Sequence, residues 1–289
     1  MRRVIIAGAG AAGLSAAIWA KRLGLEPVIM ERSTKAGGQL ATYSLPVVDL
    51  PGFGPGTAQQ LVEHLVGQVR DLAIPIQYES EVAAWDGRRL YVSSSDVPVD
   101  ADWLFYAPGL KARTLHAPGE QWISQASVSA LAGERPGLQL LIAGAGDRAV
   151  EGAIRLVEAG HQVTLASRSP RIRARGSYRQ RLIESGAAIL FETTIARIEP
   201  HPKGKVGAWL RSPHGDILWT GDQILARIGM EPRVHPELAS VRGDIAYPRV
   251  LGMSIIGDAA LPAWERSLVS AFASSMRAVK ESSKRMDGR

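Results

Sequence analysis

The sequence predicts an α/β fold of two domains, each a parallel sheet with a β-meander, with the second domain inserted into the first. Three observations carry this prediction. A strand–turn–helix–strand pattern at residues 4–33 recurs, in the same register, at residues 140–169. A run of short strands separated by turn residues follows each copy. A further strand and a long helix come at the end, after the second domain has closed.

The first copy contains a glycine-rich turn of the Rossmann type. An apolar β-branched run enters the turn GAGAAG, and an alanine-rich helical stretch follows at residues 14–23. Gly8 permits the tight turn, Gly10 lets the backbone approach a pyrophosphate, and Gly13 lets the helix pack against the strand. The pyrophosphate then lies at the helix N-terminus, where free N–H groups and the helix dipole favour an anion.

Glu31 ends the second strand of this copy. A carboxylate at this point can accept hydrogen bonds from the ribose hydroxyls of adenosine, and it repels a 2′-phosphate. The first site is therefore predicted to bind FAD or NAD rather than NADP.

The second copy differs at the positions that select the nucleotide. Ala149 replaces the third glycine, which the motif tolerates, and Ser167 takes the place of Glu31. Four arginines follow this serine: Arg168, Arg171, Arg173 and Arg175. Loss of the acid and gain of guanidinium groups are typical of a site for a 2′-phosphate, because guanidinium pairs with phosphate by forked, charge-assisted hydrogen bonds. We predict NADPH here, and the alternative is a solvated basic loop.

Arg148, inside the second turn, either reaches the pyrophosphate or lies in solvent. The predicted NADPH contacts are Gly144, Gly146, Asp147, Arg148, Ala149, Arg168 and Arg173.

Composition narrows the possible chemistry. The chain of 289 residues has no cysteine, which excludes disulfides, thiolate metal sites, iron–sulfur ligation and thiol redox catalysis on this chain. The six histidines show no metal-binding spacing, so no metal is expected. A net charge of +6 favours acidic partners, but no basic stripe interleaved with aromatic residues indicates nucleic acid.

No apolar run is long enough to span a membrane. The first twenty residues superficially resemble a secretory signal, but their internal duplicate indicates that they belong to the fold. We expect a cytoplasmic protein.

The strand-rich stretches have the same plan in both halves. The first half has predicted strands at 74–78, 81–85, 89–93, 97–100 and 103–106, with turns at 86–87 and 94–96. The second has them at 188–192, 196–199, 206–211, 217–220 and 224–229. The tail adds strands at 247–249 and 253–256 and a helix at 268–285. The expected domains are 1–112 with 230–289, and 113–229.

These motifs resemble those of low-molecular-weight thioredoxin reductases, flavoproteins with two dinucleotide-binding domains. The resemblance covers essentially the whole chain. It rests on the GAGAAG turn with Glu31, the segment GGQL at 37–40, the turn GAGDRAVEGA, the arginine loop SRSPRIRA and the segment IGD at 256–258. It implies FAD in the first domain, NADPH in the inserted domain, and a homodimer.

The resemblance also implies where the flavin lies. Gly38 and Gln39 would lie along the flavin, Asp258 would bind the ribityl chain, and the helix after it would point at the pyrimidine end. Tyr43 is either an aromatic against the flavin ring or an amphipathic surface residue. The predicted FAD contacts are Gly8, Gly10, Ala11, Ala12, Gly13, Glu31, Arg32, Gly38, Gln39, Leu40, Tyr43, Val82, Ala107, Gly109, Gly257, Asp258, Ser267 and Leu268.

The chain departs from thioredoxin reductases at the redox centre. Those enzymes carry C-x-x-C shortly before the second turn, where this chain has SQASVS at 124–129, so dithiol reduction by that route is chemically impossible. The stretch 39–53 is more similar to ferredoxin/flavodoxin–NADP reductases. Arg227 occupies a position that is normally apolar.

We therefore hypothesise an FAD-dependent NAD(P)H oxidoreductase that passes electrons to an acidic carrier such as ferredoxin or flavodoxin, with no side-chain catalyst. In an alternative, Pro108, Arg148 and Arg227 mark a degenerate nucleotide site, and another protein reduces the flavin. In a third, the chain is a non-enzymatic flavin or nucleotide sensor.

Overall fold

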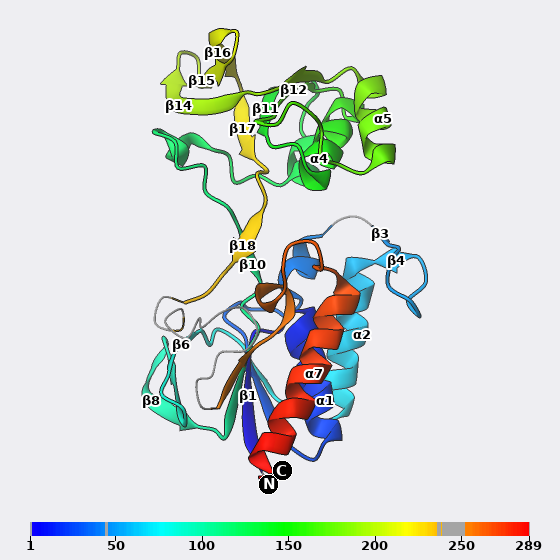
Figure 1. The fold of residues 1–289 in the computed structure, drawn as a ribbon, viewed down its shortest axis with the longest axis vertical. Helices are drawn as coiled ribbons and strands as arrows, with labels where there is room; N and C mark the ends of the chain where they lie inside the picture. The colour runs from blue at the N-terminus through cyan, green and yellow to red at the C-terminus, as the bar shows by residue number, and fades with distance from the viewer. Residues whose placement is uncertain (1, 44–45, 236–237, 239–251, 289) are drawn as a thin grey trace. The chain divides into compact units, whose positions relative to one another are not determined.

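The computed structural model describes residues 2–43, 46–235, 238 and 252–288. The chain divides into two compact units (Figure 1). Unit 1 comprises Met1–Lys111 and Pro232–Arg289, and unit 2 comprises Ala112–Glu231. The boundaries expected from the sequence are 112/113 and 229/230.

Unit 1 is built on a five-stranded sheet in the order β19-β9-β1-β2-β5. All neighbouring strands pair in parallel. The pairing of β19 with β9 returns the end of the chain to this sheet after unit 2, as predicted. The strands are β1 (Arg3–Ala7), β2 (Glu26–Met30), β5 (Ile76–Gln77), β9 (Trp103–Tyr106) and β19 (Met253–Ile255).

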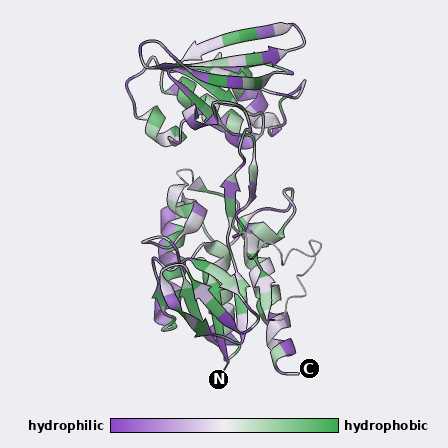
Figure 2. Ribbon diagram, turned by 90° about the vertical axis from the view of Figure 1, so that its left-hand side faces the viewer, coloured by the Kyte–Doolittle hydropathy of each residue, from purple (hydrophilic) through white to green (hydrophobic). Residues whose placement is uncertain are grey.

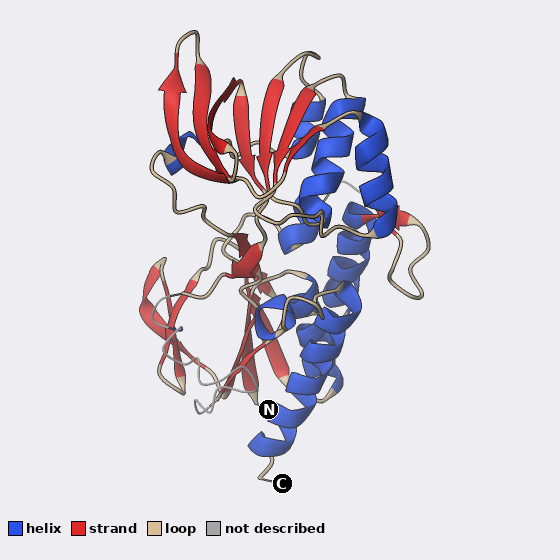
Figure 3. Ribbon diagram, turned by 45° about the horizontal axis from the view of Figure 1, so that its top comes forward, coloured by secondary structure: helices blue, strands red, loops and turns tan. Residues whose placement is uncertain are grey.

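Three helices cover one face of this sheet: α1 (Ala11–Arg22), α2 (Ala58–Asp71) and α7 (Leu268–Met286). Figure 3 shows them gathered on one side of the red strands, and α1 contacts both α2 and α7. The other face is covered by an antiparallel meander of β6 (Val82–Trp85), β7 (Arg89–Val92) and β8 (Ser95–Asp100).

The alternation of side chains along β1 explains why its sequence is continuously apolar. Val4 and Ile6 belong to the core under the helices, whereas Ile5 and Ala7 belong to the core under the meander. A parallel strand covered on both faces needs apolar side chains at every position. The strands of this sheet are accordingly mostly green in Figure 2.

Unit 2 repeats this plan with a parallel sheet in the order β13-β12-β11-β17. Its strands are β11 (Gln139–Ala143), β12 (Gln162–Ala166), β13 (Ala188–Leu190) and β17 (Gln223–Ala226). The helices α3 (Val128–Ala132), α4 (Asp147–Glu158) and α5 (Gly176–Ser185) pack on one face. The antiparallel β14 (Thr194–His201), β15 (Lys205–Ser212) and β16 (Gly215–Gly221) pack on the other.

The internal repeat is preserved in hydrogen-bond register. Gly8 N–H donates to Met30 O at 2.7 Å, and Gly144 N–H donates to Ala166 O at 2.9 Å. The helices α1 and α4 each have 12 residues. The two copies therefore fold as equivalent βαβ units, as the sequence predicts.

The first strand of each predicted meander lies elsewhere. The segment predicted at 74–78 is β5, which pairs in parallel with β2, and the segment at 188–192 is β13, which pairs in parallel with β12. Each segment contains a strand that is shorter than predicted, Ile76–Gln77 and Ala188–Leu190, and that belongs to the parallel sheet rather than to the meander. The sheet was predicted wrongly because alternation along a strand does not identify its partner.

Other predicted bounds shift by a few residues. The turn predicted at 94–96 lies at 93–94, so β8 begins at Ser95, and β17 ends at Ala226 rather than at 229. The predicted strand 247–249 lies outside the described residues.

Short elements complete the described chain. They are β3 (Pro46–Val47), β4 (Gly56–Thr57), β10 (Leu110–Ala112), β18 (Met230–Pro232) and the 3₁₀ turns η1 (Gly38–Thr42), η2 (Glu120–Trp122) and η3 (Gly257–Ala260). The two connecting segments β10 and β18 pair as a two-stranded sheet.

Among the helices that the structure describes, none combines the length and apolar character of a membrane span.

Candidate functional site

The first glycine turn has the geometry that its three glycines predict. Gly8 has φ of 109°, and a Cβ there would lie 2.5 Å from Ala107 O. A Cβ on Gly13 would overlap Gly8 O, so only glycine lets the helix pack this closely on the turn. Around Gly10 the backbone is open: the nearest atom to a Cβ would be Gly38 Cα, at 3.9 Å.

The open face of Gly10 lies at the N-terminus of α1. No described side chain caps this helix, and its first turn has no acidic residue. Its opening residues Ala11 and Ala12 are small, so the unsatisfied N–H groups are accessible to an anion. Gly37 N–H donates to Ala9 O at 2.8 Å and holds η1 against the turn.

Glu31 has a structural role in addition to the predicted one. Its carboxylate is buried and accepts hydrogen bonds from Ala9 N–H at 2.6 Å and Ser33 N–H at 2.9 Å. It therefore fixes the glycine turn to the end of β2. A carboxylate has about four acceptor positions, so ribose hydroxyls can still bind to it.

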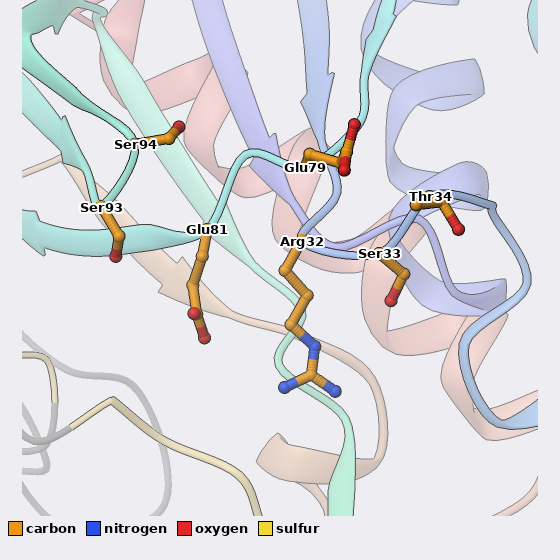
Figure 4. Close-up of a pocket in the computed structure, with 7 residues that line it drawn as sticks. All are labelled: Arg32, Ser33, Thr34, Glu79, Glu81, Ser93 and Ser94. Atoms are coloured by element: carbon orange, nitrogen blue, oxygen red, sulfur yellow. The ribbon is translucent and has the colours of Figure 1, made fainter.

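A cavity of about 520 Å³ opens directly after Glu31 (Figure 4). It lies at the carboxyl end of β2, beside the strand β1 at which the order of the sheet reverses, where ligands of such sheets bind. The predicted contact Val82 begins β6 next to this cavity and is buried in the core under the meander. The lining residues are Arg32, Ser33, Thr34, Glu79, Glu81, Ser93 and Ser94.

The tail of the chain adds a carboxyl group to the start of α1. Gly257 has φ of 71°, and a Cβ there would lie 2.6 Å from Ala12 Cβ. The next residue is Asp258, whose buried Oδ1 has no hydrogen-bond partner among the described residues. Burial raises the pKa of Asp258, against the opposing charge of Arg266. A buried acceptor without a partner is rare and fits a ligand hydroxyl.

Other predicted FAD residues have mixed surroundings. Ser267 caps α7 by accepting Ser270 N–H at 3.1 Å, and Leu268 and Leu40 pack on the core under the helices. Gly109 has φ of 66°. Tyr43 is 47% exposed at the end of η1, which leaves both interpretations of its role open. Arg32 and Gln39 are exposed.

The second glycine turn is similar in shape. Gly144 has φ of 136°, and a Cβ there would overlap Arg227 O. A Cβ on Gly146 would meet no atom within 4 Å, and no described side chain caps α4. The backbone of this turn is therefore as open to a pyrophosphate as that of the first.

The arginine loop is tied to the second turn. Arg173 N–H donates to Ala145 O at 2.9 Å. Arg175 donates to the Asp147 carboxylate through its backbone N–H at 2.8 Å and through Nε at 3.1 Å. Asp147 and Arg175 thus neutralise each other, and the remaining arginines carry the charge of this loop.

Ser167 does not replace the acid functionally. It is buried, and its Oγ accepts Ser169 N–H at 3.1 Å and donates to Ser169 O at 3.0 Å. Three arginines of the loop are exposed and form no ion pair with any described residue. They are Arg168, Arg171 and Arg173. A cationic rim without a carboxylate is what a 2′-phosphate requires.

Two further cations lie at this turn. The guanidinium of Arg227 is half-buried and, among the described residues, donates to two carbonyls: Ala226 O at 3.0 Å and Ala126 O at 3.4 Å. Burial lowers the pKa of Arg227, and the positive charge of the exposed Arg148 lowers it further. Arg148 and Arg227 are therefore close enough to repel each other, and an anion between them would stabilise both.

Sequence reasoning missed Glu79, Glu81 and Arg233. The first two lie on the loop between β5 and β6, and Arg233 follows the return strand β18. None belongs to a motif, so no local signal was available.

Among the described residues no group of three or more acidic or histidine side chains is arranged to hold a metal ion.

A family profile described as pyridine nucleotide-disulphide oxidoreductase matches residues 2–245. The chain belongs to this family. Thioredoxin reductases and ferredoxin–NADP reductases of the family use FAD and NADPH. The open glycine turns, the Oδ1 of Asp258 and the three loop arginines that form no ion pair with a described residue fit these two cofactors.

Two enzyme classes appear among the relatives of this oxidoreductase. A thioredoxin reductase of Neurospora crassa is 30% identical over 70% of this chain and 65% of that enzyme. A ferredoxin–NADP reductase of Paraburkholderia phymatum is 30% identical over 81% of this chain and 71% of that enzyme. The match thus spans about two thirds of the length of these relatives.

Among solved structures, Lactococcus lactis thioredoxin reductase superposes with a TM-score of 0.86 at 20% identity, covering 100% of both chains. The similarity in fold to thioredoxin reductases predicted from the sequence is thereby confirmed.

Proposed function

We propose that this oxidoreductase passes electrons between NAD(P)H and a carrier of the ferredoxin or flavodoxin type, without a redox-active disulfide. The single observation that carries the proposal is the pair of open, uncapped glycine turns in a chain that has no cysteine. When bound, FAD and the nicotinamide nucleotide supply the hydride chemistry, and the protein supplies binding and orientation.

Unit 1 would hold FAD. The N-terminus of α1 would neutralise the pyrophosphate at Gly10. Glu31 and the cavity after it would receive the adenosine, and the orphaned Oδ1 of Asp258 would accept a hydrogen bond from a ribityl hydroxyl. These groups lie around one helix end, which supports a single elongated ligand.

Unit 2 would hold NADPH rather than NADH. Three exposed arginines of the loop have no carboxylate partner in the described part of the chain: Arg168, Arg171 and Arg173. The position that matches the acid Glu31 is occupied by Ser167, whose Oγ is bonded within the loop. Arg148 and Arg227, whose charges repel each other at this turn, would contact the pyrophosphate.

The acceptor follows from charge and from the absence of thiols. Without cysteine this chain has no dithiol to relay electrons to a thioredoxin. Its net charge of +6 would steer an acidic one-electron carrier toward it, and relatives named ferredoxin–NADP reductase support this choice. A homodimer and a cytoplasmic location remain predictions.

A second candidate function is supported by Arg227. This half-buried cation at the Gly144 turn could mark a degenerate nucleotide site. The flavin would then be reduced by another carrier, or the protein would act as a flavin or nucleotide sensor.

Anaerobic titration of the purified yellow protein with NADPH separates these functions. We expect the oxidised flavin band to bleach, and reduced protein to pass electrons to ferredoxin or flavodoxin. A yellow protein that does not bleach would favour the second candidate. A colourless protein that cannot take up FAD would overturn the assignment altogether.

The nucleotide preference has its own test. Replacing Arg168, Arg171 and Arg173 together by glutamine should raise KM for NADPH about ten- to a hundredfold, because charge-assisted hydrogen bonds to the 2′-phosphate are lost, and should leave KM for NADH nearly unchanged. The matched control is Arg181→Gln, which removes an exposed ion pair with Glu158 in the same unit. Equal effects on the two nucleotides would contradict the proposed 2′-phosphate site.

A further inference from the structure

Two buried polar atoms without partners lie where the chain re-enters unit 1. Nε of Arg233 and Nδ1 of His235 are both buried and make no hydrogen bond to any described residue. Buried polar groups are nearly always hydrogen-bonded in folded proteins, so each such exception needs an explanation. A ligand atom that bonds to one of them is such an explanation.

Arg233 and His235 belong to a cluster of polar groups that also contains Arg32, Glu81 and Tyr106. The Tyr106 hydroxyl, at the carboxyl end of β9, accepts His235 N–H at 3.0 Å. Burial raises the pKa of Tyr106, as does the charge of Glu81, whereas the charges of Arg32 and Arg233 lower it. We call these five residues the re-entry cluster.

The guanidinium of Arg233 is only partly compensated in charge within this cluster. Its pKa is lowered first by burial and next by the charge of Arg32, with Glu81 and Tyr106 acting in the opposite direction. Two neighbouring arginines, one with a buried unbonded N–H, favour a ligand that offers acceptor atoms.

The re-entry cluster borders the cavity of Figure 4. Arg32 and Glu81 belong both to the cluster and to the cavity wall, and Figure 4 shows the Arg32 guanidinium extended away from Ser33 and Thr34. The cavity begins directly after Glu31, the acid assigned to the adenosine ribose. Arg233 thus interacts electrostatically with two residues of the wall of the cavity that we assign to the adenosine of FAD.

The backbone of this segment is fixed in place. Arg233 N–H donates to Gly109 O at 3.0 Å, and His235 N–H is bound to Tyr106. The side chain of Arg233 is thus presented from an anchored position directly after β18.

We propose that Arg233 is an additional binding residue for the adenosine half of FAD, donating from its guanidinium to an acceptor atom of the adenosine. The ligand would satisfy a buried donor that has no partner among the described residues. It would also secure residues 233–235, the point at which the chain returns from unit 2. This inference rests on the proposed binding of FAD to unit 1.

The test compares ligands that contain or lack adenosine. In apoprotein with Arg233→Ala we expect the affinities for FAD and for ADP to fall about ten- to a hundredfold, as for loss of a hydrogen bond to a charged donor, while the affinity for FMN stays unchanged. Arg233→Lys keeps the charge but not the guanidinium geometry, so its affinities for FAD and ADP should lie between those of wild type and Arg233→Ala. The control is Arg70→Gln, an exposed arginine on α2.

A second measurement does not depend on the variant folding. In wild-type apoprotein, ADP should slow hydrogen exchange of the Arg233 and His235 amides. Wild-type affinity for FAD and ADP in Arg233→Ala, or unchanged exchange with ADP bound, would overturn the inference and leave the proposed function intact. A wild-type protein that binds neither FAD nor ADP would overturn both.

Discussion

Gly13 and Ala149 occupy the same position of the two turns, but their surroundings differ. A Cβ on Gly13 would overlap Gly8 O and lie 3.2 Å from Ile6 Cγ2, whereas the Cβ of Ala149 is accommodated in a fully buried position of unit 2. Gly13→Ala should therefore lower the free energy of unfolding by about 1–3 kcal/mol, the usual cost of an overpacked core. Urea denaturation measures this change.

Gly67→Ala is the matched control for that substitution. Gly67 lies inside α2, and a Cβ there would meet no atom within 4 Å. Alanine should raise stability here by about 0.5–1 kcal/mol, because it loses less backbone freedom on folding than glycine. Equal effects at the two positions would contradict the packing role of Gly13.

Because of Asp258, we expect the stability of the ligand-free protein to depend on pH. Burial raises its pKa in the folded state. An acid whose pKa is raised by folding contributes stability that is fully present below its unfolded pKa of about 3.9. This contribution is lost as the pH rises through the pKa of the folded state. Asp258→Asn apoprotein should therefore have a higher Tm than wild type at pH 7, and the difference should shrink toward pH 4. A difference independent of pH would show that Asp258 does not titrate in this way.

Much of the candidate site could be predicted at the scale of residues. The glycines and Glu31 belong to a motif whose spacing reflects backbone geometry, so their positions follow from the sequence. Glu81 could not be predicted, because it reaches the cavity from the loop before β6, outside any motif. Arg233 could not be predicted either, because it interacts with Arg32 and Glu81 from a segment distant in sequence. The hydrogen bonds of Glu31 to Ala9 and Ser33 also depend on the folded turn.

At the scale of elements, α2 shows what a local signal contributes. It begins with a reciprocal capping box: Gln60 N–H donates to Thr57 Oγ1 at 3.1 Å, and Thr57 N–H donates to Gln60 Oε1 at 2.8 Å. This helix was not predicted from the sequence, although the spacing T-x-x-Q before an apolar pattern signals such a start.

Thr57→Ala should lower the free energy of unfolding by about 1 kcal/mol, as expected for loss of an N-cap. Gln60→Ala combined with it should cost less than the sum of the single changes, because each side chain bonds the other's backbone. Chemical denaturation of the single and double variants measures this coupling. Gln59→Ala, exposed on the same helix, is the control, and full additivity would contradict the reciprocal box.

The strands β5 and β13 mark the limit of prediction for elements. Their conformation follows from local alternation, but their place in the parallel sheets depends on the neighbours β2 and β12. Such pairing is decided by non-local packing, which a single sequence does not contain.

At the scale of the whole molecule, the repeat and the tail were sufficient to predict two similar units with one inserted in the other. Unit 2 has cores of its own on both faces of its sheet. A fragment of residues 112–231 should therefore fold alone and melt cooperatively. It should bind NADPH, with quenching of the nucleotide fluorescence, and should not take up FAD. Calorimetry and nucleotide fluorescence measure this, and a fragment without a cooperative transition would show that unit 2 depends on unit 1.

The complementary variant joins the two ends of the insertion. Because β10 pairs with β18, Ala112 and Met230 can be linked by a short turn that replaces unit 2. This shortened chain should retain FAD and lose all reduction by NADPH. Loss of FAD from a folded shortened chain would contradict an independent flavin site in unit 1.

The pairing of β19 with β9 also sets an order of events on the ribosome. Every residue of unit 2 is synthesised before β19, η3 and α7, which complete the sheet, supply Asp258 and cover α1. Unit 2 can thus mature while unit 1 still exposes an open sheet edge and an uncovered apolar helix face. We expect the nascent chain to be most vulnerable to aggregation in this interval, and the proposed flavin site, which includes Asp258, would be complete only after η3 and α7 have emerged.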